Sequence, residues 1–193
     1  MKKRLLASGL ALMITISGIS TSYAGTADFG ASGAAADIEY DLEEMLNYAI
    51  EDEYLAQEEY EVIMEEYGVR RPFSNIIKAE ARHISALLPL FEEYGFDVPV
   101  NDAEDRVEVP DSLTEIFSIG VEAEIKNIEM YKSFLEEDLP EDVKMVFENL
   151  MKASESHLRA FERSGERNNV GLSINGRNNK SNGFAYRYGI NNQ

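Results

Sequence analysis

Four segments of this chain repeat apolar residues every three or four positions, and this spacing constrains the fold more than any other feature of the sequence. A spacing of three and four is the period of an amphipathic α-helix. The segments begin or end at residues that commonly bound helices, such as Pro72, Gly68 and Gly95. We predict an all-α protein with helices from about Asp41 to Tyr67, from Pro72 to just before Gly95, from the Ser112-x-x-Glu115 capping box through Leu135, and from near Pro140 to just before Gly165.

The links between these segments predict how the helices pair. Only a few residues join the first helix to the second and the third to the fourth, so each pair is expected to form an antiparallel hairpin. A longer link, Gly95 to Asp111, joins the second helix to the third. At about 3.3 Å per extended residue this link can traverse a bundle of helices of this length. The sequence therefore permits a four-helix bundle with a long crossover.

The two ends of the chain differ from the helical segments in composition. A basic start, an apolar stretch and small residues before Gly25 predict a secretory signal peptide over residues 1–24, cut after Ala24. The stretch is short for a membrane span, so we expect a secreted or extracytoplasmic protein without membrane association. Residues 25–37 are expected to be a flexible leader, residues 38–163 the bundle, and residues 164–193 a disordered Asn/Gly-rich tail. An attachment role for the tail is an alternative to simple mobility.

Cysteine content and charge exclude several classes of function. The chain has no cysteine, which excludes disulfides, thiolate zinc sites and iron–sulfur clusters, so any metal must be held by oxygen and nitrogen. Cleavage of residues 1–24 removes three basic residues and no acidic one, which changes the net charge from −18 to −21. We expect no nucleic acid partner, because binding phosphates requires a basic surface. We interpret the acidic charge as a source of solubility and self-repulsion, with the concentration of cations near the surface as the alternative interpretation.

Polar residues interrupt the apolar stripe of each predicted helix near its middle. Packing the helices side by side brings these positions to one level. Unpaired carboxylates buried at that level would cost several kcal/mol each. A divalent cation compensates them directly, since carboxylates and imidazoles are ordinary ligands of iron, manganese and zinc. The residues are Glu53 in the first helix, Glu80 and His83 in the second, Glu124 in the third, and Ser154 and His157 in the fourth.

An internal repeat relates the two halves of the bundle. Residues 79–87 align with residues 153–161, and the alignment superposes His83 on His157, the chain's two histidines. Each half thus contributes one Glu-bearing helix and one His-bearing helix, as a metal site with two-fold symmetry requires. The first and third helices each carry a Glu with a Tyr seven positions later: Glu53 and Tyr60, Glu124 and Tyr131. We interpret both tyrosines as packing residues with a hydroxyl near the site.

Several motifs resemble those of a known family. They are Asp52-Glu53-Tyr54, residues 71–77, Ala79-Glu80-x-x-His83, residues 120–124, and Ala153-Ser154-x-x-His157. This set resembles an uncharacterised prokaryotic family called domain of unknown function 2202, and more widely the ferritin-like superfamily. The superfamily resemblance implies a ferritin-like four-helix bundle of two antiparallel hairpins with a long crossover between helices 2 and 3. It also implies a di-metal core that performs ferroxidase, peroxidase or oxygenase chemistry. Carried over by position, the metal ligands would be Glu53, Glu80, His83, Glu124 and His157.

The chain departs from the full superfamily pattern at Ser154, where a second bridging Glu would stand. Three carboxylates and two imidazoles carry one negative charge fewer than the usual set of four carboxylates. We expect Ser154 to act through a bound water, and the metal to be iron, manganese or zinc. A di-iron centre is favoured, with a single metal as the alternative.

Two hypotheses of function follow from the sequence. The first is an exported metal-binding protein, with oxidase or peroxidase chemistry on Fe(II) or reactive oxygen. The second is a metal-free helical surface or interaction module whose buried histidines and acids form a polar network. The sequence leaves open whether the protein is an enzyme, and it is compatible with a monomer or a homodimer.

Overall fold

The structure, a computed structural model, describes residues 28–37, 39–107 and 111–175, and all the secondary-structure elements in these residues are helices. This confirms the predicted all-α class. The signal peptide predicted for residues 1–24 and the tail beyond residue 175 lie outside the described residues. The elements are α1 (Gly30–Ala34), α2 (Leu42–Tyr67), α3 (Phe73–Tyr94), the short 3-10 helix η1 (Ala103–Asp105), α4 (Leu113–Phe134) and α5 (Glu141–Asn175).

Capping groups bound the helices, among them the predicted Ser112 cap and the two predicted terminal glycines. The Asp41 carboxylate accepts a bond from the Glu44 N–H, and the Glu44 carboxylate accepts one from the Asp41 N–H, both at 2.9 Å, which starts α2 with a capping box. The Ser112 hydroxyl accepts the Glu115 N–H at 3.3 Å and starts α4. Gly68 and Gly95 end α2 and α3 with φ values of 62° and 72°, in the left-handed region that glycine enters without steric cost.

The last helix is longer than predicted. The sequence predicts that this helix ends before Gly165, but α5 continues to Asn175. Ser164 is buried, and a Cβ at Gly165 would lie 3.6 Å from the Phe117 side chain, so this part of α5 packs closely on α4. A glycine inside a helix costs about 1 kcal/mol, which tertiary packing of this kind outweighs.

The segment predicted as a flexible leader contains α1, which packs against α2 and α4. Its first two N–H groups donate to carboxylates of α2, from Ala31 to Asp52 at 2.9 Å and from Gly30 to Glu51 at 3.2 Å. Ala31 and Ala34 are buried. Long-range bonds of this kind leave no periodic signal in so short a segment, which is why sequence reasoning missed the helix.

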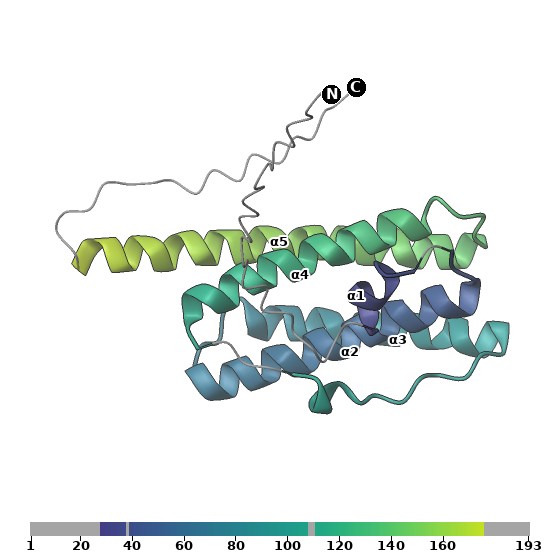
Figure 1. Cartoon of the computed structure of the whole chain (residues 1–193), viewed down its shortest axis with the longest axis horizontal. Coiled ribbons are helices and arrows are strands. Elements are labelled where there is room, and N and C mark those ends of the chain that lie inside the picture. Colours follow the sequence, from purple (N-terminus) through teal and green to yellow (C-terminus); the bar gives the residue numbers. More distant parts are fainter. Residues whose placement is uncertain (1–27, 38, 108–110, 176–193) are drawn as a thin grey trace, which may run out of the picture.

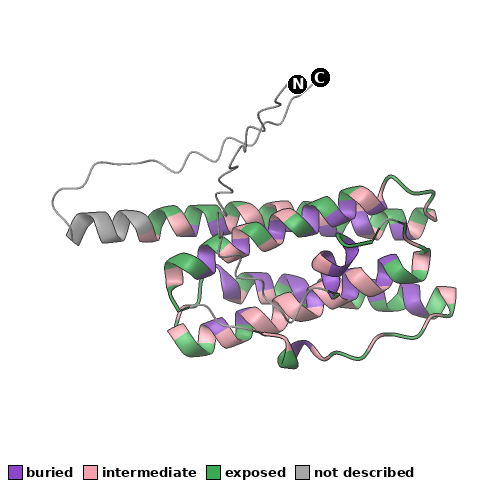
Figure 2. Cartoon of the chain, viewed as in Figure 1, coloured by how far each residue is buried: buried purple, intermediate pink, exposed green. Residues whose placement is uncertain are grey.

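The long helices form two layers (Figure 1), with α2 packed along α3 in one and α4 along α5 in the other. The described part of the link after α3 runs along the α2–α3 layer and places η1 against α2. Buried residues line the faces on which the layers meet (Figure 2), as amphipathic helices require. Among the described helices, none combines the length and the hydropathy needed to cross a membrane.

Two apolar clusters fill the bundle, one towards each end. The first includes Leu46 and Ile50 of α2, Phe91 of α3, and Phe134 and Phe147 of α4 and α5. The second is formed by Tyr60, Ile63, Phe73, Ile76, Ile116, Phe117 and Phe161. Along every long helix the polar residues singled out in the sequence fall between the residues of the first cluster and those of the second. The bundle therefore encloses a polar layer between two apolar ones.

Gly120 allows α4 to approach α5 next to this polar layer. A Cβ at Gly120 would lie 2.9 Å from the Phe161 ring, which is fully buried. We expect Gly120→Val to lower the free energy of unfolding by about 1–3 kcal/mol through overpacking, measured by urea denaturation. Gly165→Ala is the matched control, because its added Cβ makes an ordinary contact at 3.6 Å. Equal effects of the two substitutions would contradict this account of the packing.

Candidate metal centre

The polar layer brings together side chains from all four long helices. Glu53 comes from α2, Glu80 and His83 from α3, Glu124 from α4, and His157 from α5. Glu80 and His83 share a face of α3 because residues three apart on a helix are neighbours. The three carboxylic side chains are almost fully buried, with exposed fractions of 2% for Glu53, 2% for Glu80 and 4% for Glu124. The structure thus places all five predicted ligands in one buried layer; that they bind metal stays a prediction.

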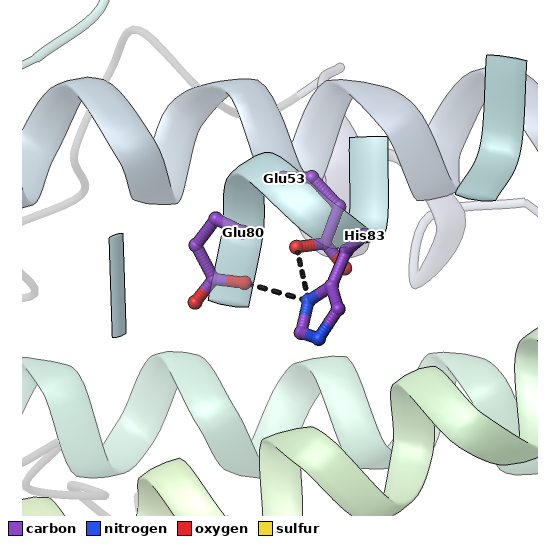
Figure 3. A group of neighbouring side chains, drawn as sticks. All are labelled: Glu53, Glu80 and His83. Atoms are coloured by element: carbon purple, nitrogen blue, oxygen red, sulfur yellow. Dashed lines mark hydrogen bonds and ion pairs between the residues drawn. The ribbon is translucent and has the colours of Figure 1, made fainter. Parts of the chain in front are cut away.

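One half of the layer is built by Glu53, Glu80 and His83 (Figure 3). The Nδ1 atom of His83 lies 3.0 Å from Glu53 Oε2 and 2.7 Å from Glu80 Oε2. The three ligand atoms therefore face a common point between α2 and α3.

The other half is built by Glu80, Glu124 and His157. His157 Nδ1 lies 3.2 Å from Glu80 Oε1 and 3.5 Å from Glu124 Oε1. The rings of His83 and His157 stack with their centroids 5.8 Å apart. Glu80 therefore turns one oxygen towards each histidine and belongs to both halves.

Two buried tyrosines donate hydrogen bonds across the α2–α4 interface, each to a carboxylate of the other helix. The Tyr131 hydroxyl on α4 donates to Glu53 Oε1 on α2 at 3.1 Å. The Tyr60 hydroxyl on α2 donates to Glu124 Oε1 on α4 at 3.3 Å. The sequence repeat placed each hydroxyl near the site, but it did not predict that each would hold the carboxylate of the other helix.

Burial and neighbouring charge set the protonation of the three acids. Burial raises the pKa of Glu80 well above its usual value, and the charge of Glu53 and a hydrogen bond to it raise it further. Burial also raises the pKa of Glu124, although His157 opposes the rise. Burial alone would raise the pKa of Glu53, but bonds from His83, Glu80 and Tyr131 hold it below its ordinary value. The metal-free layer thus favours the ionised form of Glu53 and the protonated form of Glu80.

Ser154 is buried in the same layer, one turn before His157. Its hydroxyl donates to the Leu150 carbonyl at 3.2 Å, a bond within α5. The Ser154 hydroxyl therefore donates its proton within α5. The water that we expected at Ser154 stays a prediction.

Sequence reasoning missed Asp52 and Asn127, which border the layer. Asp52 Oδ2 accepts a bond from Asn127 Nδ2 at 2.6 Å, and its Oδ1 accepts the Ala31 N–H. Asp52 thereby ties α1, α2 and α4 together. Two signals were available in the sequence: Asp52 precedes Glu53 in the Asp52-Glu53-Tyr54 motif, and Asn127 lies three positions after Glu124 on the buried stripe.

The arrangement fits a pair of divalent cations. Two ligand atoms that bind one transition metal at 2.0–2.2 Å lie about 3.0–3.5 Å from each other. The contacts between His Nδ1 and carboxylate oxygen, 2.7 to 3.5 Å, span this range. Glu124 Oε2 is buried and has no hydrogen-bond partner among the described residues. An unpaired buried carboxylate oxygen is costly, and a cation beside it removes that cost.

Two partly buried acids of α2 also predict how stability depends on pH. Burial raises the pKa of Asp52 to about 7 despite the bond from Ala31, and the charges of Glu53 and Glu124 add to the rise. Burial and the charge of Glu124 raise the pKa of Glu59 to about 7 as well. A group whose pKa is higher folded than unfolded stabilises the protein below its unfolded pKa, and this stability is lost as the pH rises through the folded pKa.

We therefore expect the metal-free protein to melt several degrees lower at about pH 7.5 than at about pH 5. Bonds to Arg106 and Tyr94 lower the pKa values of Asp102 and Asp142. The stability that these two residues contribute is therefore lost only at a pH below this range. Circular dichroism melts in the presence of a chelator test the expectation. A higher melting temperature at the upper pH would contradict it.

Comparison with known proteins identifies the family. Residues 42–174 match an uncharacterised protein domain, DUF2202. The chain is 31% identical over 128 residues to the uncharacterised protein MJ0754 of Methanocaldococcus jannaschii, and the match spans 58% of this chain and 69% of that protein. The crystal structure of hypothetical protein MJ0754 is similar at a TM-score of 0.60 and 28% identity, over 70% of this chain and 84% of that one. The match to the domain spans the whole of α2 to α4 and nearly all of α5, and the chain belongs to the DUF2202 family.

Proposed function

We propose that this protein is a ferritin-like di-metal protein that binds two divalent transition-metal ions in the polar layer of its bundle. One ion is held by Glu53 and His83, and the other by Glu124 and His157. Glu80 would contribute one oxygen to each ion. The observation that carries the proposal is the placement of Glu80, whose two oxygens lie 2.7 and 3.2 Å from the Nδ1 atoms of different histidines.

The packing of the helices supports the ferritin-like part of the proposal. The pairs α2–α3 and α4–α5 pack most extensively, and a long link joins α3 to α4. Two hairpins joined by a long crossover are the topology of ferritin-like bundles, whose metal ligands come from the middle of all four helices.

The chain's own residues prepare the layer for two cations. The apolar clusters on either side exclude bulk water, which strengthens electrostatic attraction inside. The cross-helix bonds from Tyr60 and Tyr131 fix the orientation of Glu124 and Glu53. A cation held beside Glu80 would lower the pKa of its carboxyl group, and the proton would pass to solvent. Two iron ions held in this layer would supply oxidation–reduction chemistry, and we propose that each Fe(II) is oxidised to Fe(III) while dioxygen accepts the electrons.

Anaerobic loading with two Fe(II) per chain, followed by exposure to dioxygen, tests the reaction. We expect Fe(III) absorbance to appear at least 10-fold faster than in buffer, and Glu124→Gln to remove most of this acceleration because it removes a ligand. Glu129→Gln is the matched control on the same helix, since Glu129 is exposed. Oxidation at the buffer rate in the wild-type protein would refute the proposed reaction while leaving metal binding open to direct measurement.

The two tyrosines provide a separate test of the centre. Removing one hydroxyl leaves Oε1 of Glu53 or Glu124 without its donor, so Tyr131→Phe and Tyr60→Phe should each weaken metal binding about 10-fold to 100-fold. Competition with a chelating dye measures the affinity. Tyr94→Phe is the control, because Tyr94 donates to Asp142 in another part of the bundle. If all three variants bound metal as the wild type does, the tyrosines would have no part in the centre.

The metal-free alternative predicted from the sequence requires a complete network of hydrogen bonds in the polar layer. The unpartnered Glu124 Oε2 leaves that network incomplete among the described residues, which favours the metal-binding proposal.

We also propose that the protein acts outside the cytoplasm, on the strength of the signal-peptide pattern over residues 1–24. Sequencing the N-terminus of the protein secreted by its own host tests this. A mature chain beginning at Gly25 is expected, and an intracellular chain that retains Met1 would contradict it.

A further inference from the structure

The two His-bearing helices of the bundle differ at one position. In α3 the pair is Glu80-x-x-His83, and in α5 the aligned pair is Ser154-x-x-His157. Glu80 lies within 3.2 Å of both histidines, whereas Ser154 carries no charge and bonds to the Leu150 carbonyl. The repeat therefore supplies one shared carboxylate where exact two-fold symmetry would supply two.

Neighbouring acids do not replace the missing carboxylate. Glu155, the next residue, is only partly buried and lies 3.9 Å from Arg159 on the outer side of α5. Both oxygens of Asp52 accept bonds from α1 and α4. The metal-binding groups of the described residues accordingly contain three carboxylates: Glu53, Glu80 and Glu124.

Charge within the loaded layer is then unbalanced. Two divalent ions bring four positive charges, and the three carboxylates bring three negative ones. The remaining positive charge lies between two apolar clusters, where an uncompensated charge costs several kcal/mol. The excess of acidic residues on the protein surface is separated from this charge by solvent and acts only weakly on it.

We propose that the metal-loaded centre binds one small monocarboxylate of the formate or acetate class beside Ser154. This inference rests on the proposed function. Such an anion has the charge and the two oxygens of the carboxylate that the repeat lacks at Ser154. It is also about as large as the part of a Glu side chain that Ser does not have. Hard oxygen donors of this kind suit the same metals as the Glu ligands.

The test uses the full chain loaded with two Co(II), whose visible absorbance reports changes in the ligands of the metal. Titration with sodium acetate, in a buffer that does not coordinate metal, is expected to change the spectrum saturably with one acetate per chain. Ser154→Glu places a carboxylate at the position and should weaken the acetate response at least 10-fold while two Co(II) still bind. Ser154→Asp is the second variant, with a smaller side chain that disturbs packing less.

Two controls separate the position from other effects. Ser156→Glu adds the same charge at an exposed position of α5 and should leave the acetate response as in the wild type. Ser154→Ala should also retain the response, because the missing carboxylate, and not the hydroxyl, creates the site. A wild-type spectrum indifferent to acetate, with two Co(II) bound, would overturn the anion site alone. A chain that binds no Co(II) would overturn the proposed function as well.

Discussion

Replacing Glu80 with Gln is expected to abolish the binding of both metal ions and to leave the metal-free protein folded. Glu80 contributes an oxygen to each half of the layer, so its loss affects both ions. Burial and the neighbouring Glu53 hold the Glu80 pKa well above its usual value, which favours the protonated side chain in the metal-free protein. Gln has the shape of a protonated Glu and also has a donor, but it cannot become the anion that the metals require.

Thermal unfolding with and without added Mn(II) measures this effect. At a free metal concentration of about 100 times Kd, binding stabilises a folded protein by about 2.7 kcal/mol per site. We expect the wild type to gain this stabilisation and Glu80→Gln to gain none of it. Glu92→Gln, on an exposed position of the same helix, should behave as the wild type. Equal stabilisation of Glu80→Gln by Mn(II) would show that Glu80 does not hold the metals.

Replacing one histidine at a time is expected to remove one metal ion at a time. His83 contacts only carboxylates of the first half, and His157 only those of the second. His83→Gln and His157→Gln should each lower the bound metal from two ions to one per chain, and the double variant should bind none. Losing a direct ligand costs more than the 10-fold to 100-fold that is typical for losing an outer hydrogen-bond partner.

Elemental analysis of the gel-filtered proteins gives these stoichiometries. A centre that holds a single metal would give a different pattern, in which one histidine substitution removes all the metal and the other removes none. Unchanged metal content in the double variant would support the metal-free hypothesis instead. Circular dichroism of each variant checks that the helices have formed.

The positions of the four long helices could be predicted from the sequence because their signals are local. Period, capping residues and terminal glycines act within a few positions, and they placed the bounds of α2, α3 and α4 within a residue or two. The features that the sequence did not predict depend on contacts between segments that lie far apart in the chain. α1 is held by carboxylates of α2 some twenty residues away, and α5 passes Gly165 because it packs on Phe117.

The candidate site was predictable to a similar degree. Glu53, Glu80, Glu124 and His157 were recognisable as polar residues on apolar stripes, since the helical period alone puts them on the buried face. The roles within the site depend on tertiary geometry. Neither the two-sided placement of Glu80 nor the tyrosine bonds across α2 and α4 follows from spacing along one helix.

Crystals grown with Mn(II), with diffraction measured near the manganese absorption edge, test most directly whether Glu80 lies between two metal ions. We predict two anomalous peaks per chain, about 3.5–4 Å apart as in other two-metal sites, one beside Glu53 and His83 and the other beside Glu124 and His157. A core without peaks, with the five side chains bonded only to each other, would contradict the account.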